Sequence, residues 1–155
     1  MKGAAAPSGV HTFLVLWRAA RAVEMRALGS IETTGLCASD FGVLEALLHK
    51  GPLPVNVLGR KLLLTSGSMT TSIDRLVARD LVERRDDPQD RRIRVVALTA
   101  AGRRLIKAAF ARHETHLDDV VAVLTKEERT TLVNLLRKLG KHAGGVIDDA
   151  DVVRM

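Results

Sequence analysis

Two short β-prone runs interrupt a chain whose other segments have apolar residues at helical spacing. These runs limit the folds that the chain can adopt. The runs are residues 81–85 and 93–98, and the turn-forming stretch Asp86-Asp87-Pro88-Gln89-Asp90 separates them. They predict a β-hairpin with a charged tip, beside which lie Arg91 and Arg92. A single hairpin among helices predicts a mainly α fold with a small β element, of the α+β class.

Apolar residues at helical spacing predict the other elements. The predicted helices cover residues 11–28, 39–49, 54–62, 66–79, 100–124 and a last stretch from 126 onward. Gly29-Ser30 is expected to end the first helix and Gly51-Pro52 the second, while Pro54 is tolerated in the first turn of the third.

Threonines precede the last three predicted helices: Thr65, Thr99 and Thr125. A threonine oxygen accepts a hydrogen bond from a free N–H of the first helical turn, so each is a suitable N-cap. Thr125 with Glu128 also has the spacing of a capping box. The last helix then carries leucines on one face, at Leu132, Leu135, Leu136 and Leu139.

The helix after Thr65 has two unlike faces. At 100° per residue, one side carries Met69, Ile73, Leu76 and Val77, and the other Gly67, Ser68, Thr71 and Arg75. Small hydroxyls and an arginine allow close approach to another surface. A short helix, a turn and a helix with such a face match a helix-turn-helix, which places its second helix in the DNA major groove.

Length and composition limit the rest of the interpretation. The 155 residues suit one domain, and no apolar run reaches the roughly 18 residues that a membrane helix needs. The N-terminus lacks the apolar core of a signal peptide, so we expect a cytoplasmic protein without membrane association. The single cysteine cannot form a disulfide within the chain.

Positive charge is concentrated in one block. The net charge is +6, and residues 60–104 hold 11 basic and 6 acidic side chains, whereas residues 105–155 hold 8 of each. A local positive field is typical of a partner with phosphate groups, although a solvated basic surface would have the same composition.

Several segments resemble the multiple-antibiotic-resistance regulator (MarR) family. Asp87-Pro88-Gln89-Asp90-Arg91-Arg92 followed by 95–102 is similar to the family's wing and the helix start behind it, and 76–84 to the end of its recognition helix and first wing strand. Phe41-Gly42-Val43-Leu44 matches its second helix, so the resemblance covers about residues 11–142.

This resemblance implies a homodimeric repressor on a pseudo-palindromic DNA operator. Residues 36–99 would form a winged helix-turn-helix lobe within one subunit of residues 1–155, and 11–30 with 100–142 the dimerisation helices. Arg92 then enters the minor groove, Asp90 orients it and Arg91 meets phosphate. On the recognition helix we expect Thr71 and Arg75 to read base edges in the major groove, with further base or phosphate contacts from Ser66, Ser68 and Thr70.

Release from DNA is expected by one of two routes. Small aromatic or phenolic effectors bind many relatives near the junction of the dimer helices and the DNA-binding lobe, and the candidates here are Trp17, Arg18 and Phe41. At its helical spacing, however, Trp17 is better explained as dimer core. The second route is oxidation of Cys37, since helix N-termini favour the thiolate; the alternative is a small residue without chemistry.

Other function classes have less support in the sequence. His113 and His116 stand at i, i+3 but lack a nearby third ligand, and no phosphate-binding glycine loop or nucleophile elbow is present. We therefore expect no metal site, no cofactor and no enzymatic activity. The remaining alternative is an architectural protein that binds DNA irrespective of sequence.

Overall fold

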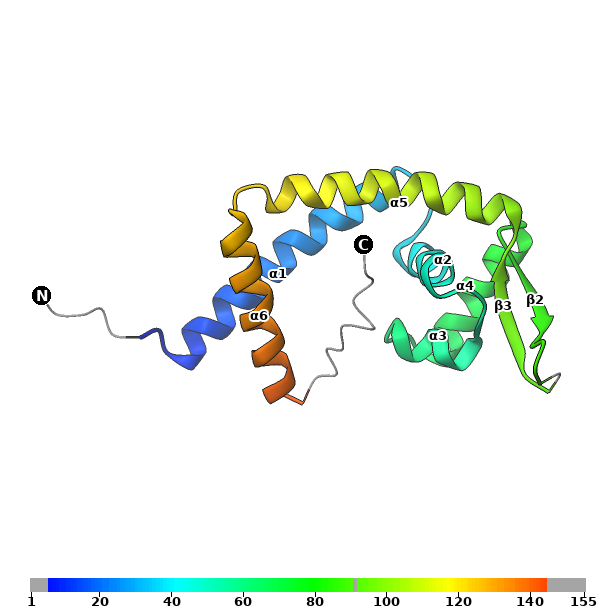
Figure 1. Cartoon of the computed structure of the whole chain (residues 1–155), viewed down its shortest axis with the longest axis horizontal. Helices are drawn as coiled ribbons and strands as arrows, with labels where there is room; N and C mark the ends of the chain where they lie inside the picture. The colour runs from blue at the N-terminus through cyan, green and yellow to red at the C-terminus, as the bar shows by residue number, and fades with distance from the viewer. Residues whose placement is uncertain (1–5, 91, 145–155) are drawn as a thin grey trace, which may run out of the picture.

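The computed structural model describes residues 6–90 and 92–144. Its elements are α1 (Gly9–Glu32), α2 (Ala38–Lys50), β1 (Leu53–Pro54), α3 (Val55–Lys61), α4 (Ser66–Ala78), β2 (Val82–Asp86), β3 (Arg94–Leu98), α5 (Ala100–Val121) and α6 (Lys126–His142). In Figure 1 a lobe of α2, α3, α4 and the strands lies beneath the first half of α5, while α1 runs beside its second half. The predicted fold class, mainly helical with a small antiparallel β element, is confirmed.

The sheet has three strands in the order β1-β3-β2. The hairpin of β2 and β3 was predicted, but β1 was not. Its two residues, Leu53 and Pro54, pair with Val96 and Val95 of β3. A two-residue strand is too short for a periodic signal, and Pro54 can join only because β1 is an edge strand.

A single apolar core holds the lobe together. Its fully buried members include residues of α2, α3, α4, β3 and α5: Phe41, Leu44, Leu47, Leu58, Met69, Ile73, Leu76, Val96 and Ile106. Of the apolar face predicted for α4, only Val77 is substantially open to solvent, at 37%. The core thus fixes α4 with its opposite face outward.

The first helix is longer than predicted, because Gly29-Ser30 does not end it. Ser30 stays helical while its hydroxyl contacts both the carbonyl of Ala27 and Nδ1 of His113 on α5, at 2.7 and 2.6 Å. Ile31 beyond it is buried, which anchors the last turn. The chain turns only at Gly35, whose φ of 73° suits glycine.

The predicted caps are confirmed. Thr65, Thr99 and Thr125 each accept a hydrogen bond from the third residue of the following helix, and Thr125 with Glu128 forms the full capping box. Gly51 follows α2 with a φ of 77°. Pro54 is the N-cap of α3 rather than part of its first turn, a difference of one residue.

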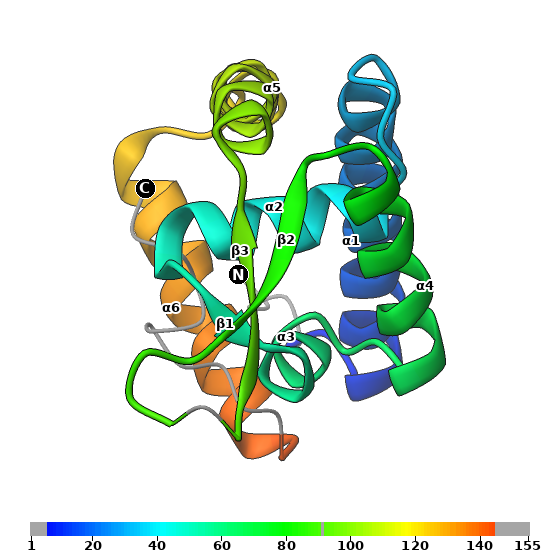
Figure 2. The same cartoon turned by 90° about the vertical axis from the view of Figure 1, so that its right-hand side faces the viewer.

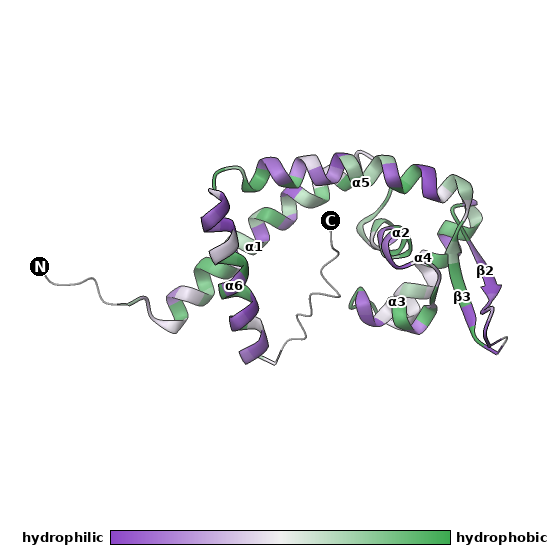
Figure 3. Ribbon diagram, in the orientation of Figure 1, coloured by the Kyte–Doolittle hydropathy of each residue, from purple (hydrophilic) through white to green (hydrophobic). Residues whose placement is uncertain are grey.

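Apolar side chains remain exposed on the helices outside the lobe. Those on α1 and α6 are Val10, Phe13, Leu14, Val15, Trp17, Val23, Met25, Leu132, Val133, Leu135, Leu136 and Leu139. No residue of α6 is buried within the single chain, and Figure 3 shows α6 standing clear of the lobe. Across residues 6–90 and 92–144, none of the helices is long and apolar enough to cross a membrane.

Candidate nucleic-acid interface

The outward face of α4 is a surface of small hydroxyl residues. Ser66, Ser68, Thr70 and Thr71 are all exposed near the start of the helix. Gly67 among them has no neighbouring atom within 4 Å of the point where a Cβ would stand. Another surface can therefore approach the helix backbone closely along this face.

Local hydrogen bonds decide what these hydroxyls can offer. Thr70 and Thr71 donate to the carbonyls of Ser66 and Gly67, each at 3.0 Å, so their oxygens are left to accept. Ser68 accepts the hydroxyl proton of Thr65 at 2.9 Å and keeps its own proton to donate. Thr71 is thus suited to the amino group of adenine or cytosine, and Ser68 to a phosphate oxygen.

Arg75, on the same helix, forms an ion pair with Asp40 of α2. Its Nε and Nη2 donate to Asp40 at 3.2 and 2.8 Å. The Asp40 side chain is 4% exposed and that of Arg75 46%. The structure therefore places Arg75 at the edge of the predicted base-reading face, with half of its guanidinium already engaged.

This ion pair determines the charge state of both groups. Burial alone raises the pKa of Asp40, but the hydrogen bonds and the positive charge of Arg75 outweigh it, so the pKa lies below its usual value. The same contacts with Asp40 raise the pKa of Arg75. Asp40 is a functional candidate that sequence reasoning missed, because nothing local links it to an arginine 35 residues away.

The wing tip is organised by two aspartates. Asp87 Oδ1 accepts from the backbone N–H of Gln89 and of Asp90, at 2.7 and 3.2 Å. Asp90 Oδ1 in turn accepts from the backbone N–H of Arg92 at 3.0 Å. Asp90 therefore holds the main chain of Arg92 rather than its guanidinium. Arg91, the third residue predicted here, lies outside the described residues.

Three of the described arginines of the wing are paired with acidic side chains. Arg84 pairs with Asp74 of α4, Arg85 with Glu83 and Arg94 with Asp86. Within the described part of the chain, no carboxylate pairs with the exposed side chain of Arg92. Its charge is thus available to a partner.

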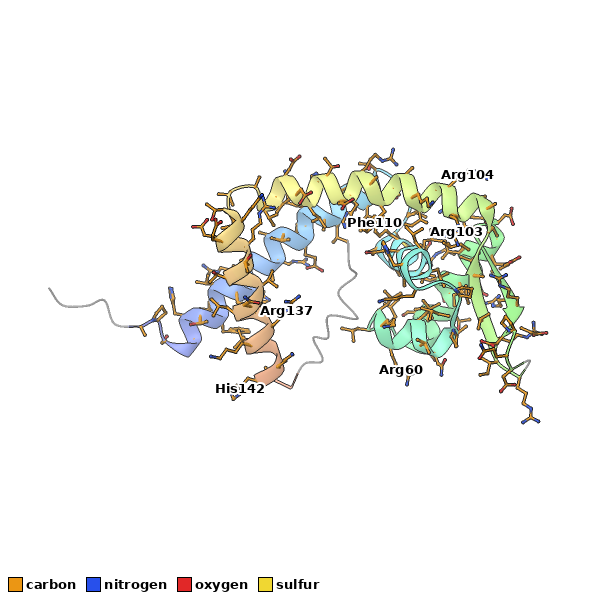
Figure 4. All side chains as sticks on the ribbon, in the orientation of Figure 1. Arg60, Arg103, Arg104, Phe110, Arg137 and His142 are labelled. Atoms are coloured by element: carbon orange, nitrogen blue, oxygen red, sulfur yellow. The ribbon has the colours of Figure 1, made fainter. Side chains whose placement is uncertain are left out.

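The hydroxyl face and the wing tip lie at the same end of the lobe. Because β2 returns antiparallel to α4, the tip of the hairpin and the start of α4 both lie at the lower edge in Figure 2. Arg60 of α3 points to this side in Figure 4, whereas Arg103 and Arg104 of α5 lie at the opposite end. A helix face and a projecting wing on one side define a winged helix-turn-helix DNA-binding protein.

The chain's relatives agree with this class. Residues 34–93 match the model of the MarR family. The transcriptional regulator MhqR of Bacillus subtilis is 36% identical over 131 residues, which is 84% of this chain and 90% of MhqR. The chain belongs to the MarR family and is a DNA-binding transcriptional regulator of that family.

Two solved structures show the same fold. A cysteine-to-serine mutant of Escherichia coli MarR, complexed with operator DNA, is 25% identical with a TM-score of 0.70 over 81% of this chain and 90% of that one. Bordetella bronchiseptica BpsR, whose DNA binding is regulated by 6-hydroxynicotinic acid, is 29% identical with a TM-score of 0.73 over 89% of this chain and 98% of that one.

The residues predicted for effector binding and redox chemistry belong to two elements, α1 for Trp17 and Arg18 and the start of α2 for Phe41 and Cys37. Trp17 and Arg18 are exposed on α1, with Trp17 at 57%. Phe41 is buried in the lobe, its ring edge-on to that of His113 at 5.0 Å. Cys37 is the exposed N-cap of α2, and its Sγ lies 3.3 Å from both Ser39 Oγ and Arg75 Nη2.

A cavity of about 470 Å³ lies between α1 and α5, and none of the predicted effector residues lines it. Its lining residues are Met25, Arg26, Gly29, Ser30, Thr33, Arg112 and His116. The i, i+4 spacing of Arg112 and His116 is the signal that could have placed both on one face of α5. Within the described residues, no group of three or more His, Cys, Asp or Glu side chains could hold a metal ion.

Proposed function

We propose that this chain is a homodimeric repressor that binds a pseudo-palindromic operator, with α4 in the major groove and the wing in the minor groove. The observation that carries the proposal is the placement of the start of α4, with its hydroxyl face, and the tip of the β2–β3 hairpin at one end of the lobe. Operator DNA in the structure of the relative MarR supports it. A dimer would present two such lobes related by two-fold symmetry, and this symmetry matches that of a pseudo-palindromic DNA sequence.

The unpartnered face of α1 and α6 supports dimerisation. These helices expose Phe13, Trp17, Leu135 and further apolar residues in one chain. Stable interfaces bury roughly 800 Å² on each partner. We infer that a second copy of the chain covers this face, because two-fold symmetric homodimers, which pair the same surface of each subunit, are the commonest oligomers.

Selection of DNA by the wild-type protein from a randomised library tests the proposal. We expect an enriched inverted repeat whose half-sites lie about one helical turn, ~34 Å, apart. Thr71→Ala should then weaken binding to the selected DNA more than to random DNA, because a base contact is lost. Enrichment of no sequence would support the architectural alternative.

The cavity between α1 and α5 is our proposed effector site. Its volume falls within the usual range for small-molecule sites, and Arg26, Arg112 and His116 offer donors to an anionic group. An aromatic or phenolic acid would suit this lining. The regulation of DNA binding of the relative BpsR by 6-hydroxynicotinic acid supports this class of effector. We expect phenolic acids to release the selected DNA from wild-type protein and to lose potency with Arg112→Ala.

Oxidation of Cys37 is the alternative release route that we propose to test. The thiolate would attack one oxygen of hydrogen peroxide, so that the O–O bond breaks, hydroxide leaves, and the sulfur is oxidised to sulfenic acid while the peroxide is reduced. The exposure of Cys37 and its contact with Arg75 of α4 support the route. Peroxide should release DNA from wild type and not from Cys37→Ser; equal release from both proteins would rule the route out.

A further inference from the structure

The guanidinium of Arg75 is held along one edge only. Nε and Nη2 form that edge and donate to the two oxygens of Asp40, and Nη2 also lies 3.2 Å from Ser72 Oγ and 3.3 Å from Ser39 Oγ. Ser72 donates to Ser39 at 2.8 Å, so the hydroxyls beside the ion pair are linked as well. Within the residues that the structure describes, Nη1 has no acceptor.

The network joins two elements of the lobe. Asp40 stands in the first turn of α2, and Arg75 in the last turn of α4. The carboxylate of Asp40 is 4% exposed and depends on Arg75 for its counter-charge. Because an arginine side chain has many rotamers, this anchoring also removes most of its freedom before DNA arrives.

The held edge limits what Arg75 can read. A free arginine recognises guanine by donating to O6 and N7 from two nitrogens of its fork. Nη2 carries two N–H groups, which are shared among Asp40, the hydroxyls of Ser72 and Ser39 and the Sγ of Cys37. A guanine fork contact through Nη1 and Nη2 would require some of these contacts to break. Nη1 alone can reach a partner without that cost.

We propose that Asp40 is a positioning residue for DNA recognition, which holds one edge of Arg75 so that Nη1 is the only nitrogen this arginine presents to DNA. Arg75 then contacts a single acceptor atom at a defined place on the α4 face. The inference rests on the proposed function, because it concerns how the selected DNA is recognised.

The test compares Asp40→Asn with Asp74→Asn by measuring affinity for the DNA that wild type selects and for random DNA. Both variants remove one negative charge next to the interface, but Asp74 is an exposed residue of α4 whose side chain pairs with Arg84 rather than with Arg75. We expect Asp40→Asn to lower the ratio of selected to random affinity by about tenfold or more, the range of one good base contact, and Asp74→Asn to leave it unchanged.

A second variant covers the case in which Asp40→Asn does not fold. Asp40→Asn/Arg75→Gln leaves no buried charge unpaired, and circular dichroism should show wild-type helix content. We expect the double variant to lower the ratio of selected to random affinity by the same factor as Arg75→Gln alone, since the two residues act as one unit. A ratio in the double variant that is clearly lower than in Arg75→Gln alone, or one that equals the wild-type ratio, would overturn the positioning role.

The outcomes separate this inference from the proposed function. If wild type enriches no sequence, the proposed function fails and the positioning role fails with it. If wild type enriches a sequence but Asp40→Asn and Asp74→Asn have equal ratios, only the positioning role is overturned. Repeating the selection with Asp40→Asn should alter base preference at one position of each half-site, which a loss of stability alone would not do.

Discussion

Arg92 lies at the wing tip with its main chain fixed and its side chain exposed. We predict that Arg92→Ala greatly weakens binding to the selected DNA without affecting folding or dimerisation, because the residue packs no core. Arg92→Lys should recover only part of the affinity, since lysine keeps the charge and loses the planar fork. Asp90→Ala should show a milder defect, because Arg92 loses one backbone anchor.

Binding isotherms at two salt concentrations check this prediction. Arg94→Ala is the matched control, since Arg94 is also an exposed wing arginine but is already paired with Asp86 at 3.2 Å. An Arg92→Ala protein that binds like wild type would remove the wing from recognition.

Asp40 predicts a pH dependence of stability. Its pKa is lowered from 3.8 in the folded chain, so the folded state favours the ionised form. That contribution is complete above the unfolded pKa and is lost as the pH falls through the lower folded pKa. Urea unfolding of wild type and Asp40→Asn should therefore differ most near neutral pH and converge below about pH 4. A difference that grows on acidification would contradict the assignment.

At the scale of elements, the base of the wing is packed directly against α5. The Oγ1 of Thr99 donates to the carbonyl of Asp80 at 2.7 Å and accepts from the N–H of Gly102 at 3.0 Å. A Cβ on Gly102 would lie 1.9 Å from the carbonyl oxygen of Leu81. The helix can approach the backbone just before β2 this closely only with glycine at that position.

Gly102→Ala should accordingly destabilise the fold by about 1–3 kcal/mol, the usual cost of overpacking. Gly29→Ala is the comparison, because an added Cβ there meets nothing within 4 Å and alanine favours a helix interior by up to ~1 kcal/mol. Thermal unfolding should move the two midpoints in opposite directions; a shift of both in the same direction would argue against the close contact.

The elements that could be predicted from the sequence are those with local signals. Threonine caps, the two faces of α4 and the turn of the wing each depend on residues a few positions apart. The end of α1 was predicted wrongly, because the contacts of Ser30 with His113 and the burial of Ile31 depend on packing against other elements. The same reason hid the pairing of Asp40 with Arg75 and the cavity that Arg26 shares with Arg112.

At the scale of the whole molecule, the leucine face of α6 is uncovered in the single chain. Leu135 is 59% exposed in the single chain. We predict that Leu135→Glu dissociates or unfolds the protein and abolishes DNA binding, whereas Asn134→Glu, on the other side of α6, leaves a dimer. Analytical ultracentrifugation at micromolar concentration distinguishes these states. A stable folded wild-type monomer would refute dimerisation through this face.

The continuity of α5 has a mechanical consequence. The helix is uninterrupted over 22 residues, with the wing bonded to its start and the cavity residues Arg112 and His116 in its second half. At 1.5 Å per residue, about 24 Å of rigid rod separates His116 from Ala100, so a tilt of ~5° at the cavity displaces the wing by ~2 Å. α5 can thus act as a lever. A displacement of that size is comparable to a hydrogen-bond length. If the proposed effector tilts the rod, we expect it to move the wing without contacting the wing itself.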